Sequence, residues 1–289
     1  MRLPDHLIEC VGFLCERRAS GGATKFQPVA TAFFMSVQSK TIKNAQYNYL
    51  ITARHCVNER LYLRLNTRKG GYEYIELRDE WLFHADPNVD VGVLPFAPDT
   101  SLFEYKTADA SMLATEAKTA EHLIGIGEEV AIPGLFVNRI GNERNIPIVR
   151  FGNLAAMPVE KIVGSQSGQA FHAYLVEVRS IGGLSGSPVF AYLGPSRVSE
   201  RGLDLGHYYL FLLGVVRGHW HFDKDRSEIN ALADDAKSVN MGIALVTPAT
   251  ELETIIYGDY LIKGRATKDQ ELLVESAAAI KEDSSPLSS

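Results

Sequence analysis

Residues 181–190 read Ile-Gly-Gly-Leu-Ser-Gly-Ser-Pro-Val-Phe, a glycine-rich turn that presents Ser185 between two apolar runs. Glycine lacks a Cβ atom, so it can take positive φ values and let the backbone approach a bound group closely. A serine hydroxyl becomes a nucleophile when a base takes its proton and backbone N–H groups receive the charge on the attacked carbonyl oxygen. The turn therefore predicts that the amides of Gly183 and Ser185 converge on one oxyanion.

Two other segments supply partners for such a serine. Residues 52–56 read Thr-Ala-Arg-His-Cys, and residues 89–94 read Val-Asp-Val-Gly-Val-Leu. With the serine turn, they resemble the motifs Thr-Ala-x-His-Cys, Asp-(small or apolar)-x-Leu-Leu and Gly-x-Ser-Gly-(Gly or Ser)-Pro of chymotrypsin-like (trypsin-fold) serine proteases, in the same order. The resemblance implies that His55 is the catalytic base, Asp90 its orienting carboxylate and Ser185 the nucleophile.

Short strand patterns separated by turn residues indicate an all-β protein. The resemblance, which covers roughly residues 28–256, implies two six-stranded antiparallel β-barrels followed by a C-terminal helix. We expect a first lobe over residues 1–98, a linker over 99–122, a second lobe over 123–258 and a flexible polar tail over 259–289. The helix is expected to start at Pro248, with Thr247 as its N-cap.

The composition restricts the partners. The chain has 289 residues, 46% of them hydrophobic, and a net charge of −6, which argues against nucleic-acid binding through a broad basic surface. No apolar run reaches the length of about 18 residues that a membrane helix needs. We expect peptide or protein substrates and a regulatory protein partner, with no nucleic acid, membrane or cofactor.

The cysteines predict a reducing compartment, and hence a cytoplasmic protein. Only Cys10, Cys15 and Cys56 occur, too few and too irregular for a disulfide framework. Secreted members of the family usually pair the cysteine after the catalytic histidine with one in the preceding strand. Residues 31–35, which occupy that strand, contain no cysteine.

By resemblance, Arg217, Gly218 and His219 lie in the strand that pairs with the substrate backbone, and Gly242 lines the pocket for the residue before the cut. Arg179 would lie near the floor of that pocket, where trypsin-like enzymes specific for Lys and Arg carry an acid. We therefore predict that cleavage after Lys or Arg is disfavoured. An inward Arg179 would attract an acidic residue, and an outward one would leave room for a small or apolar residue.

Arg217 occupies a place where the family usually has a small residue that supports the catalytic Asp. A guanidinium that reached the three catalytic residues would lower the basicity of His55. Leu184 stands where the digestive enzymes carry the Asp that pairs with a newly cut N-terminus. We therefore expect no activation by propeptide removal, and either direct folding to an active state or switching by a partner.

Three other interpretations of the sequence compete with this one. An α/β-hydrolase needs Gly-x-Ser-x-Gly and the order Ser, acid, His, neither of which is present. His219 and His221, with Asp223 and Asp225, offer metal-ligand types, but the segment is polar and has no matching ligands elsewhere, so we predict no metal site. The third is a protease fold that binds peptides or partner proteins without cutting them.

Overall fold

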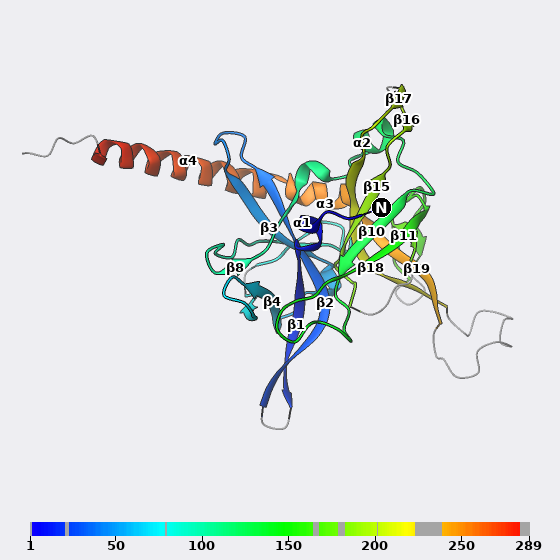
Figure 1. The fold of residues 1–289 in the computed structure, drawn as a ribbon, viewed down its shortest axis with the longest axis horizontal. Helices are drawn as coiled ribbons and strands as arrows, with labels where there is room; N and C mark the ends of the chain where they lie inside the picture. The colour runs from blue at the N-terminus through cyan, green and yellow to red at the C-terminus, as the bar shows by residue number, and fades with distance from the viewer. Residues whose placement is uncertain are drawn as a thin grey trace, which may run out of the picture.

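The computed structural model describes residues 2–20, 23–78, 80–163, 168–178, 183–200, 202–222 and 239–283. β-Strands are the main secondary structure of the described residues, and most of the strands belong to two large sheets that lie side by side in Figure 1. The first sheet comes from the N-terminal part of the chain and the second from the C-terminal part.

The first sheet has nine strands and is mainly antiparallel. Its main path runs β5-β4-β1-β2-β3-β7-β6, while β8 pairs with β4 and β9 pairs in parallel with β2. The strands are β1 (Val11–Ser20), β2 (Ala23–Gln38), β3 (Gln46–Thr52), β4 (Leu61–Thr67), β5 (Tyr72–Glu76), β6 (Leu82–Phe83), β7 (Gly92–Pro95), β8 (Phe103–Glu104) and β9 (Ala108–Asp109).

The second sheet is a closed barrel in the order β10-β11-β14-β19-β18-β15. Its strands are β10 (Glu129–Gly134), β11 (Ile148–Ala156), β14 (Tyr174–Glu177), β15 (Pro188–Leu193), β18 (Tyr209–Phe222) and β19 (Val239–Pro248). Two separate two-stranded ribbons are formed by β12 (Ile162–Val163) with β13 (Ala170–Phe171), and by β16 (Arg197–Ser199) with β17 (Gly202–Asp204).

The expectation of two six-stranded barrels is therefore correct for the second sheet and wrong for the first. Among the described residues, the first sheet stays open because its two end strands, β5 and β6, do not pair with each other. Strand β6 has only two residues, so it offers little backbone for closure. The first sheet also takes in β8 and β9, which lie within the segment that we expected to be a linker.

Successive side chains along a strand lie in different hydrophobic cores, which explains why the strand sequences are almost continuously apolar. In β15, Val189 and Ala191 lie in the core inside the barrel, whereas Phe190 lies in the core shared with the first sheet. In β2, Phe33 lies in the shared core and Phe34 in a third core on the other face of the first sheet. The shared core holds the two sheets together and so sets their relative position.

The helices are short except for the last one. They are α1 (Asp5–Ile8), the 3₁₀ turns η1 (Arg54–Cys56) and η2 (Ala110–Met112), α2 (Glu116–Glu121), α3 (Ala249–Ile256) and α4 (Asp259–Asp283). Helix α3 begins one residue later than expected, with Pro248 as its N-cap. Its Ala249, Leu252 and Ile256 are buried in the shared core.

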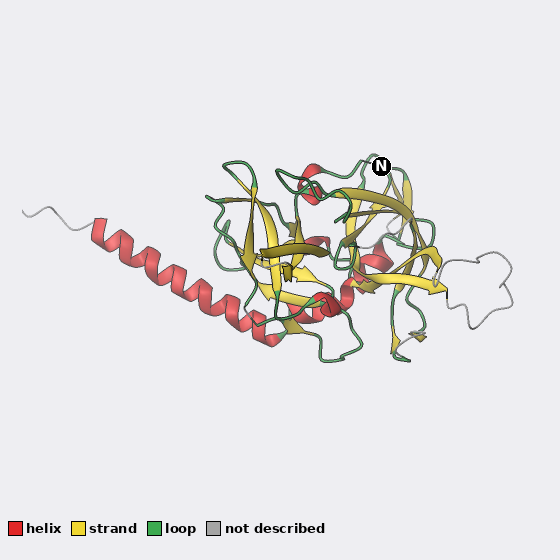
Figure 2. Ribbon diagram, turned by 90° about the horizontal axis from the view of Figure 1, so that it is seen from below, coloured by secondary structure: helices red, strands yellow, loops and turns green. Residues whose placement is uncertain are grey.

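Helix α4 occupies most of the segment that we expected to be a flexible tail. It starts beside α3 and extends away from the rest of the molecule in both Figure 1 and Figure 2. Its first half is held by the first sheet, since Ser39 Oγ donates to Asp269 at 2.9 Å and Arg265 donates to Tyr49 OH at 2.8 Å. The segment is polar, but it is also rich in the helix formers Ala, Leu, Glu and Lys, a signal that polarity alone conceals.

Candidate active site

His55 and Asp90 are brought together by neighbouring strands of the first sheet. Strand β3 ends at Thr52 and pairs with the start of β7 through Thr52 and Gly92. His55 lies in the 3₁₀ turn just after β3, and Asp90 lies just before β7. The His55 Nδ1 atom is 2.7 Å from Asp90 Oδ2, and the His55 backbone N–H donates to Asp90 Oδ1 at 2.9 Å. One carboxylate therefore orients both the ring and the main chain of His55.

Two residues of the second sheet, Thr247 and Arg217, contact the segment around Asp90. Its side chain is almost fully buried, and Thr247 Oγ1 donates to its main-chain oxygen at 3.4 Å. This contact replaces the helix-capping role expected for Thr247. Arg217 Nη1 donates to the backbone oxygen of Asn88 at 2.7 Å, and its guanidinium lies 3.7 Å from the centre of the Phe171 ring. Arg217 is thus directed at a carbonyl and an aromatic face next to Asp90.

Electrostatics favour a positively charged His55. The hydrogen bond with Asp90 is the main cause and the contact with Cys56 the second, and together they raise the pKa of His55 to about 10 against the opposing effect of burial. An ionised carboxylate can only accept, so Nδ1 must carry the hydrogen of this bond. The other ring nitrogen, Nε2, lies 3.4 Å from Cys56 Sγ.

Burial lowers the pKa of Arg217, and the charge of Asp90 opposes that effect. The two groups are therefore close enough to interact electrostatically.

Residues 183–187, here called the serine turn, precede β15 and contact both sheets. Gly183 and Gly186 have φ values of 101° and 82°, a region that favours glycine. Ser187 N donates to Leu184 O at 2.9 Å, which closes the turn. Gly186 N donates to Val216 O at 2.8 Å and thereby ties the turn to β18 of the barrel.

The serine turn also packs directly on the strand that leads to His55. Thr31 N donates to Ser185 O at 2.9 Å. A Cβ atom on Gly186 would lie 2.1 Å from Thr31 O and 2.2 Å from Thr52 Oγ1, so only glycine fits there. Ser185 is therefore held beside the end of β3. Within the described part of the chain, no hydrogen bond joins Ser185 to His55.

The proposed oxyanion donors lie in this turn. Among the described residues, the backbone N–H groups of Gly183 and Ser185 have no hydrogen-bond acceptor. Gly182, the other glycine of the motif, lies outside the described residues.

The residues expected to bind substrate lie on β18 and β19, which pair Gly218 with Leu245 and His219 with Ala244. A Cβ atom on Gly218 would have no neighbour within 4 Å, so its backbone borders open space. Gly242 has a φ of 75°, and its carbonyl accepts from Val178 N at 2.7 Å. Arg179 lies outside the described residues.

Sequence reasoning missed Thr31 and Thr52 as parts of this site. Both are fully buried on the first sheet, and Thr52 Oγ1 donates to Thr31 O at 2.8 Å. Thr52 belongs to the motif that contains His55, so its presence in that motif was an available signal. Nothing near Thr31 in the sequence points to its contacts.

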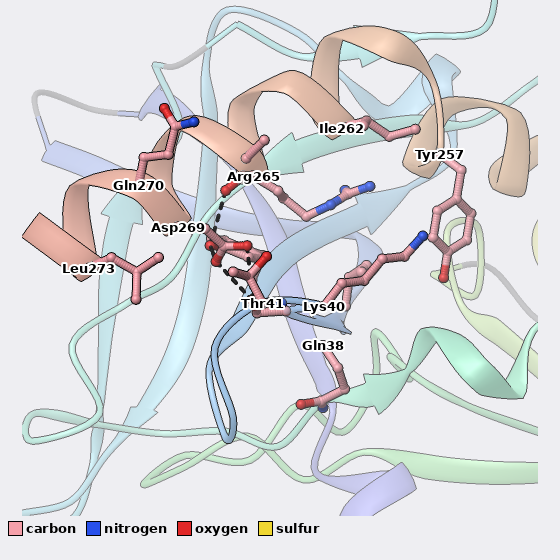
Figure 3. Close-up of a pocket in the computed structure, with 13 residues that line it drawn as sticks. Gln38, Lys40, Thr41, Tyr257, Ile262, Arg265, Asp269, Gln270 and Leu273 are labelled. Carbon is pink, nitrogen blue, oxygen red and sulfur yellow. Dashed lines mark hydrogen bonds between the residues drawn. The ribbon is translucent and has the colours of Figure 1, made fainter.

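A separate cavity of about 460 Å³ lies between helix α4 and the loop that joins β2 to β3. Figure 3 shows Asp269 and Arg265 on the helix facing Thr41 and Lys40 on the loop. The cavity borders the start of β3 through Tyr47, whereas His55 follows the other end of that strand. It is therefore distinct from the site around His55.

The described residues contain no group of three or more His, Cys, Asp or Glu side chains that could hold a metal ion. The sequence also offered metal-ligand types at residues 219–225. The side chain of His221 and the whole of Asp223 and Asp225 lie outside the described part of the structure.

In the described part of the chain, none of the helices combines the length and apolar character needed to cross a membrane.

The structure resembles solved protease domains. It aligns with the MamO protease domain from Magnetospirillum magneticum in its apo form at 15% identity and a TM-score of 0.47, covering 86% of this chain and 96% of that one. It also aligns with the Rv3671c protease of M. tuberculosis in an inactive form at 16% identity and a TM-score of 0.44, covering 87% and 89%. Likenesses this remote assign neither an activity nor a substrate to this chain. No protein-family model and no curated protein sequence matches it.

Proposed function

We propose that this protein is a serine endopeptidase that cleaves peptide bonds with His55, Asp90 and Ser185. The observation that supports the proposal most is the packing of the serine turn against the strand that leads to the hydrogen-bonded His55–Asp90 pair. In this proposal the nucleophile, the base and the orienting acid come from three distant segments of the chain, as in the Ser-His-Asp arrangement used for acyl transfer.

The proposed mechanism uses only groups of this chain. His55 Nε2 takes the proton of Ser185 Oγ as that oxygen attacks the carbonyl carbon, and Asp90 stabilises the resulting imidazolium. The amides of Gly183 and Ser185 hold the oxyanion. His55 then protonates the leaving amine as the C–N bond breaks, and a water molecule, deprotonated by His55, hydrolyses the acyl-enzyme.

Proton transfer requires a hydrogen bond of about 2.6–3.2 Å between Ser185 Oγ and His55 Nε2. In the structure Nε2 lies next to Cys56 Sγ instead. Catalytic hydrogen bonds are often long in free enzymes and shorten when substrate binds. We expect substrate to displace the Cys56 contact and to bring Ser185 Oγ to the ring.

The open space beside Gly218 suits a substrate strand that pairs with β18, because main-chain hydrogen bonds to a sheet edge need a backbone free of bulky side chains. His219 follows on the same strand, and Gly242 lies on the neighbouring strand β19. The family resemblance suggests Arg179, and no acidic residue, near the pocket for the residue before the cut, so we propose that cleavage after Lys or Arg is disfavoured.

A fluorophosphonate probe tests the proposal, because it reacts covalently with an activated serine and with few other groups. The wild-type protein should be labelled at Ser185, and Ser185→Ala should not. His55→Ala removes the base but keeps the hydroxyl, and should also prevent labelling. Labelling of Ser185→Ala at the wild-type level would contradict the proposed nucleophile.

The second candidate function is a protease fold that binds peptides without cutting them. Two observations favour it: the raised pKa of His55, since a protonated imidazole cannot act as a base, and the contact of Nε2 with Cys56 in place of Ser185. Absence of labelling across pH 6 to pH 10, together with retained peptide binding, would support this candidate over the enzyme.

We further propose a cytoplasmic location. Cys10, Cys15 and Cys56 are all described, buried and unpaired, and free thiols of this kind are typical of reducing compartments. Localisation of the tagged protein in its own cells is the direct test.

A further inference from the structure

Thr31 stands out among the buried polar residues for its contacts with the serine turn. It lies on β2 of the first sheet with no exposed surface. Its hydroxyl donates to Gly183 O at 2.9 Å and accepts from Leu135 N at 2.8 Å. Its backbone N–H donates to Ser185 O at 2.9 Å, and its carbonyl accepts from Thr52 Oγ1 at 2.8 Å. Every polar atom of Thr31 is thus used.

These contacts restrict the turn on both sides of the nucleophile. The bond to Gly183 O orients the peptide plane between Gly183 and Leu184, and the bond to Ser185 O orients the plane between Ser185 and Gly186. The plane between them carries the Ser185 amide, one of the proposed oxyanion donors. Its orientation, and that of the Ser185 side chain, is therefore limited by two bonds to one residue.

The hydroxyl is the part of Thr31 that a similarly shaped side chain could not replace. A buried carbonyl and a buried N–H each need a partner, and the hydroxyl serves Gly183 O and Leu135 N at once. Leu135 also packs under the turn, since its Cγ would lie 3.2 Å from a Cβ atom on Gly183. Removing the hydroxyl would leave Gly183 O and Leu135 N without this partner, while the bond from Thr31 N to Ser185 O would remain.

Thr31 also connects the turn to the segment that carries His55. The Thr52 hydroxyl that binds Thr31 O belongs to the last residue of β3, three positions before the histidine. The first sheet thus determines both where the base stands and how the serine turn faces it.

We propose that Thr31 is a positioning residue, whose hydroxyl holds the serine turn in the orientation that acyl transfer needs. This inference rests on the proposed function, and Thr31 touches neither the substrate nor the reacting atoms. Its loss should slow the chemical step and leave substrate binding nearly unchanged.

The test compares Thr31→Val, which keeps the shape and removes the hydroxyl, with Thr31→Ser, which restores it. Ser36→Ala is the matched control, because Ser36 is a buried hydroxyl on the same strand that accepts from Thr107 Oγ1 at 3.0 Å, away from the turn. Two readouts are needed: fluorophosphonate labelling of Ser185 with kcat and KM, and backbone amide exchange in the segment that contains the serine turn, followed by mass spectrometry.

Thr31→Val should slow labelling and lower kcat by about tenfold to a hundredfold, the size expected when a reacting group is misplaced by an ångström. KM should change little, amide exchange in the serine turn should become faster, and Thr31→Ser should recover most of both losses. Ser36→Ala should match the wild type in both readouts.

The outcomes separate this inference from the proposed function. Normal labelling in Thr31→Val, or unchanged exchange in the turn, would overturn the positioning role. A wild-type protein that does not label would overturn the proposed function instead, and a positioning role in catalysis would fall with it. Amide exchange would then still report whether Thr31 holds the turn.

Discussion

The two halves of the candidate active site are assembled in different ways. His55 and Asp90 come from neighbouring strands of one sheet and are already hydrogen-bonded through both carboxylate oxygens. Ser185 lies in the turn just before β15 of the other sheet, and Thr31 and Thr52 of the first sheet contact that turn. His55, the proposed base, is thus held within one sheet, whereas Ser185, the proposed nucleophile, depends on contacts between the two sheets.

Asp90→Asn should have the largest effect, because it breaks the preorganised half. An Asn amide would donate to Nδ1, place the proton on Nε2 and leave the ring unable to accept from Ser185. We expect kcat to fall by about 10⁴-fold while the fold is kept.

The control is Asp86→Asn, since the Asp86 carboxylate accepts from Asn88 N in the turn before Asp90 and makes no hydrogen bond to His55. Peptide hydrolysis by the two variants is the measurement. Similar losses in both would show that general damage to this turn, and not the His55 tautomer, is responsible.

Gly186→Ala should damage the other half. Its new methyl group would lie 2.1 Å from Thr31 O, at a residue with a φ of 82°. Steric overlap and backbone strain together should cost about 3 kcal/mol of unfolding free energy and strongly reduce Ser185 labelling.

Gly194→Ala is its control, because a Cβ atom there would meet only Tyr192 Cε1 at an ordinary 3.6 Å. Urea unfolding and labelling rates are the measurements. A fully stable and reactive Gly186→Ala protein would mean that the turn does not pack against the first sheet as described.

Arg64→Met sharpens the comparison by acting on the serine half from a distance. Arg64 is buried and donates to the carbonyls of Ile140 and Gly141, in the loop that continues from Leu135 beneath the serine turn. Leaving these carbonyls unpaired should destabilise the fold by about 3 kcal/mol.

The same variant should slow Ser185 labelling several-fold and leave the pH dependence of His55 unchanged. Arg78→Met removes only a well-exposed ion pair with Glu76 and should change stability by less than about 0.5 kcal/mol. Thermal unfolding and labelling against pH distinguish the two. A shifted His55 titration in Arg64→Met would show that the halves are not independent.

The smallest effect concerns the ionisation of His55. Because its folded-state pKa is raised from 6.5 to about 10, its pairing with Asp90 stabilises the fold fully below pH 6.5 and is lost as the pH rises toward 10. The reaction needs neutral His55, so kcat/KM should rise over the same interval in which stability falls.

Cys56→Ala should move the pH at which kcat/KM rises toward the ordinary histidine pKa of 6.5. The change should be smaller than that caused by loss of Asp90, because the contact with Cys56 is only the second cause of the raised His55 pKa. The measurements are the pH dependence of kcat/KM and of the unfolding free energy. His55→Gln is the control, and its stability should lack the pH dependence that His55 causes. A wild-type kcat/KM that rises with a midpoint near pH 6.5 would contradict the raised pKa of His55.

Much of the architecture could be predicted from local patterns. The apolar runs of β2, β3 and β15, and the turn residues between strands, indicated a β protein with a C-terminal helix. The open edge of the first sheet was not predictable, because whether β5 and β6 meet depends on their spatial arrangement and not on their composition. Helix α4 was not predictable from its polar composition, since its helix formers are interspersed with charged residues and the partner of Asp269, Ser39, lies 230 positions away.

The site shows the same division. Motif spacing indicated His55, Asp90 and Ser185, and the structure brings the first two into contact and places the third beside the end of β3. Thr31 carried no signal of its own, since its hydroxyl partners Gly183 and Leu135 lie 152 and 104 positions away.

The chain by itself determined which reactive groups exist, where glycine permits an unusual backbone and which segments are apolar enough to form strands, because these properties belong to single residues and their immediate neighbours. Only the tertiary structure decided that the first sheet stays open, that Cys56 lies next to His55 Nε2 and that a buried threonine holds the serine turn. Hydrogen bonds and packing act over a few ångströms, so distant residues acquire these partners only when folding brings their strands together.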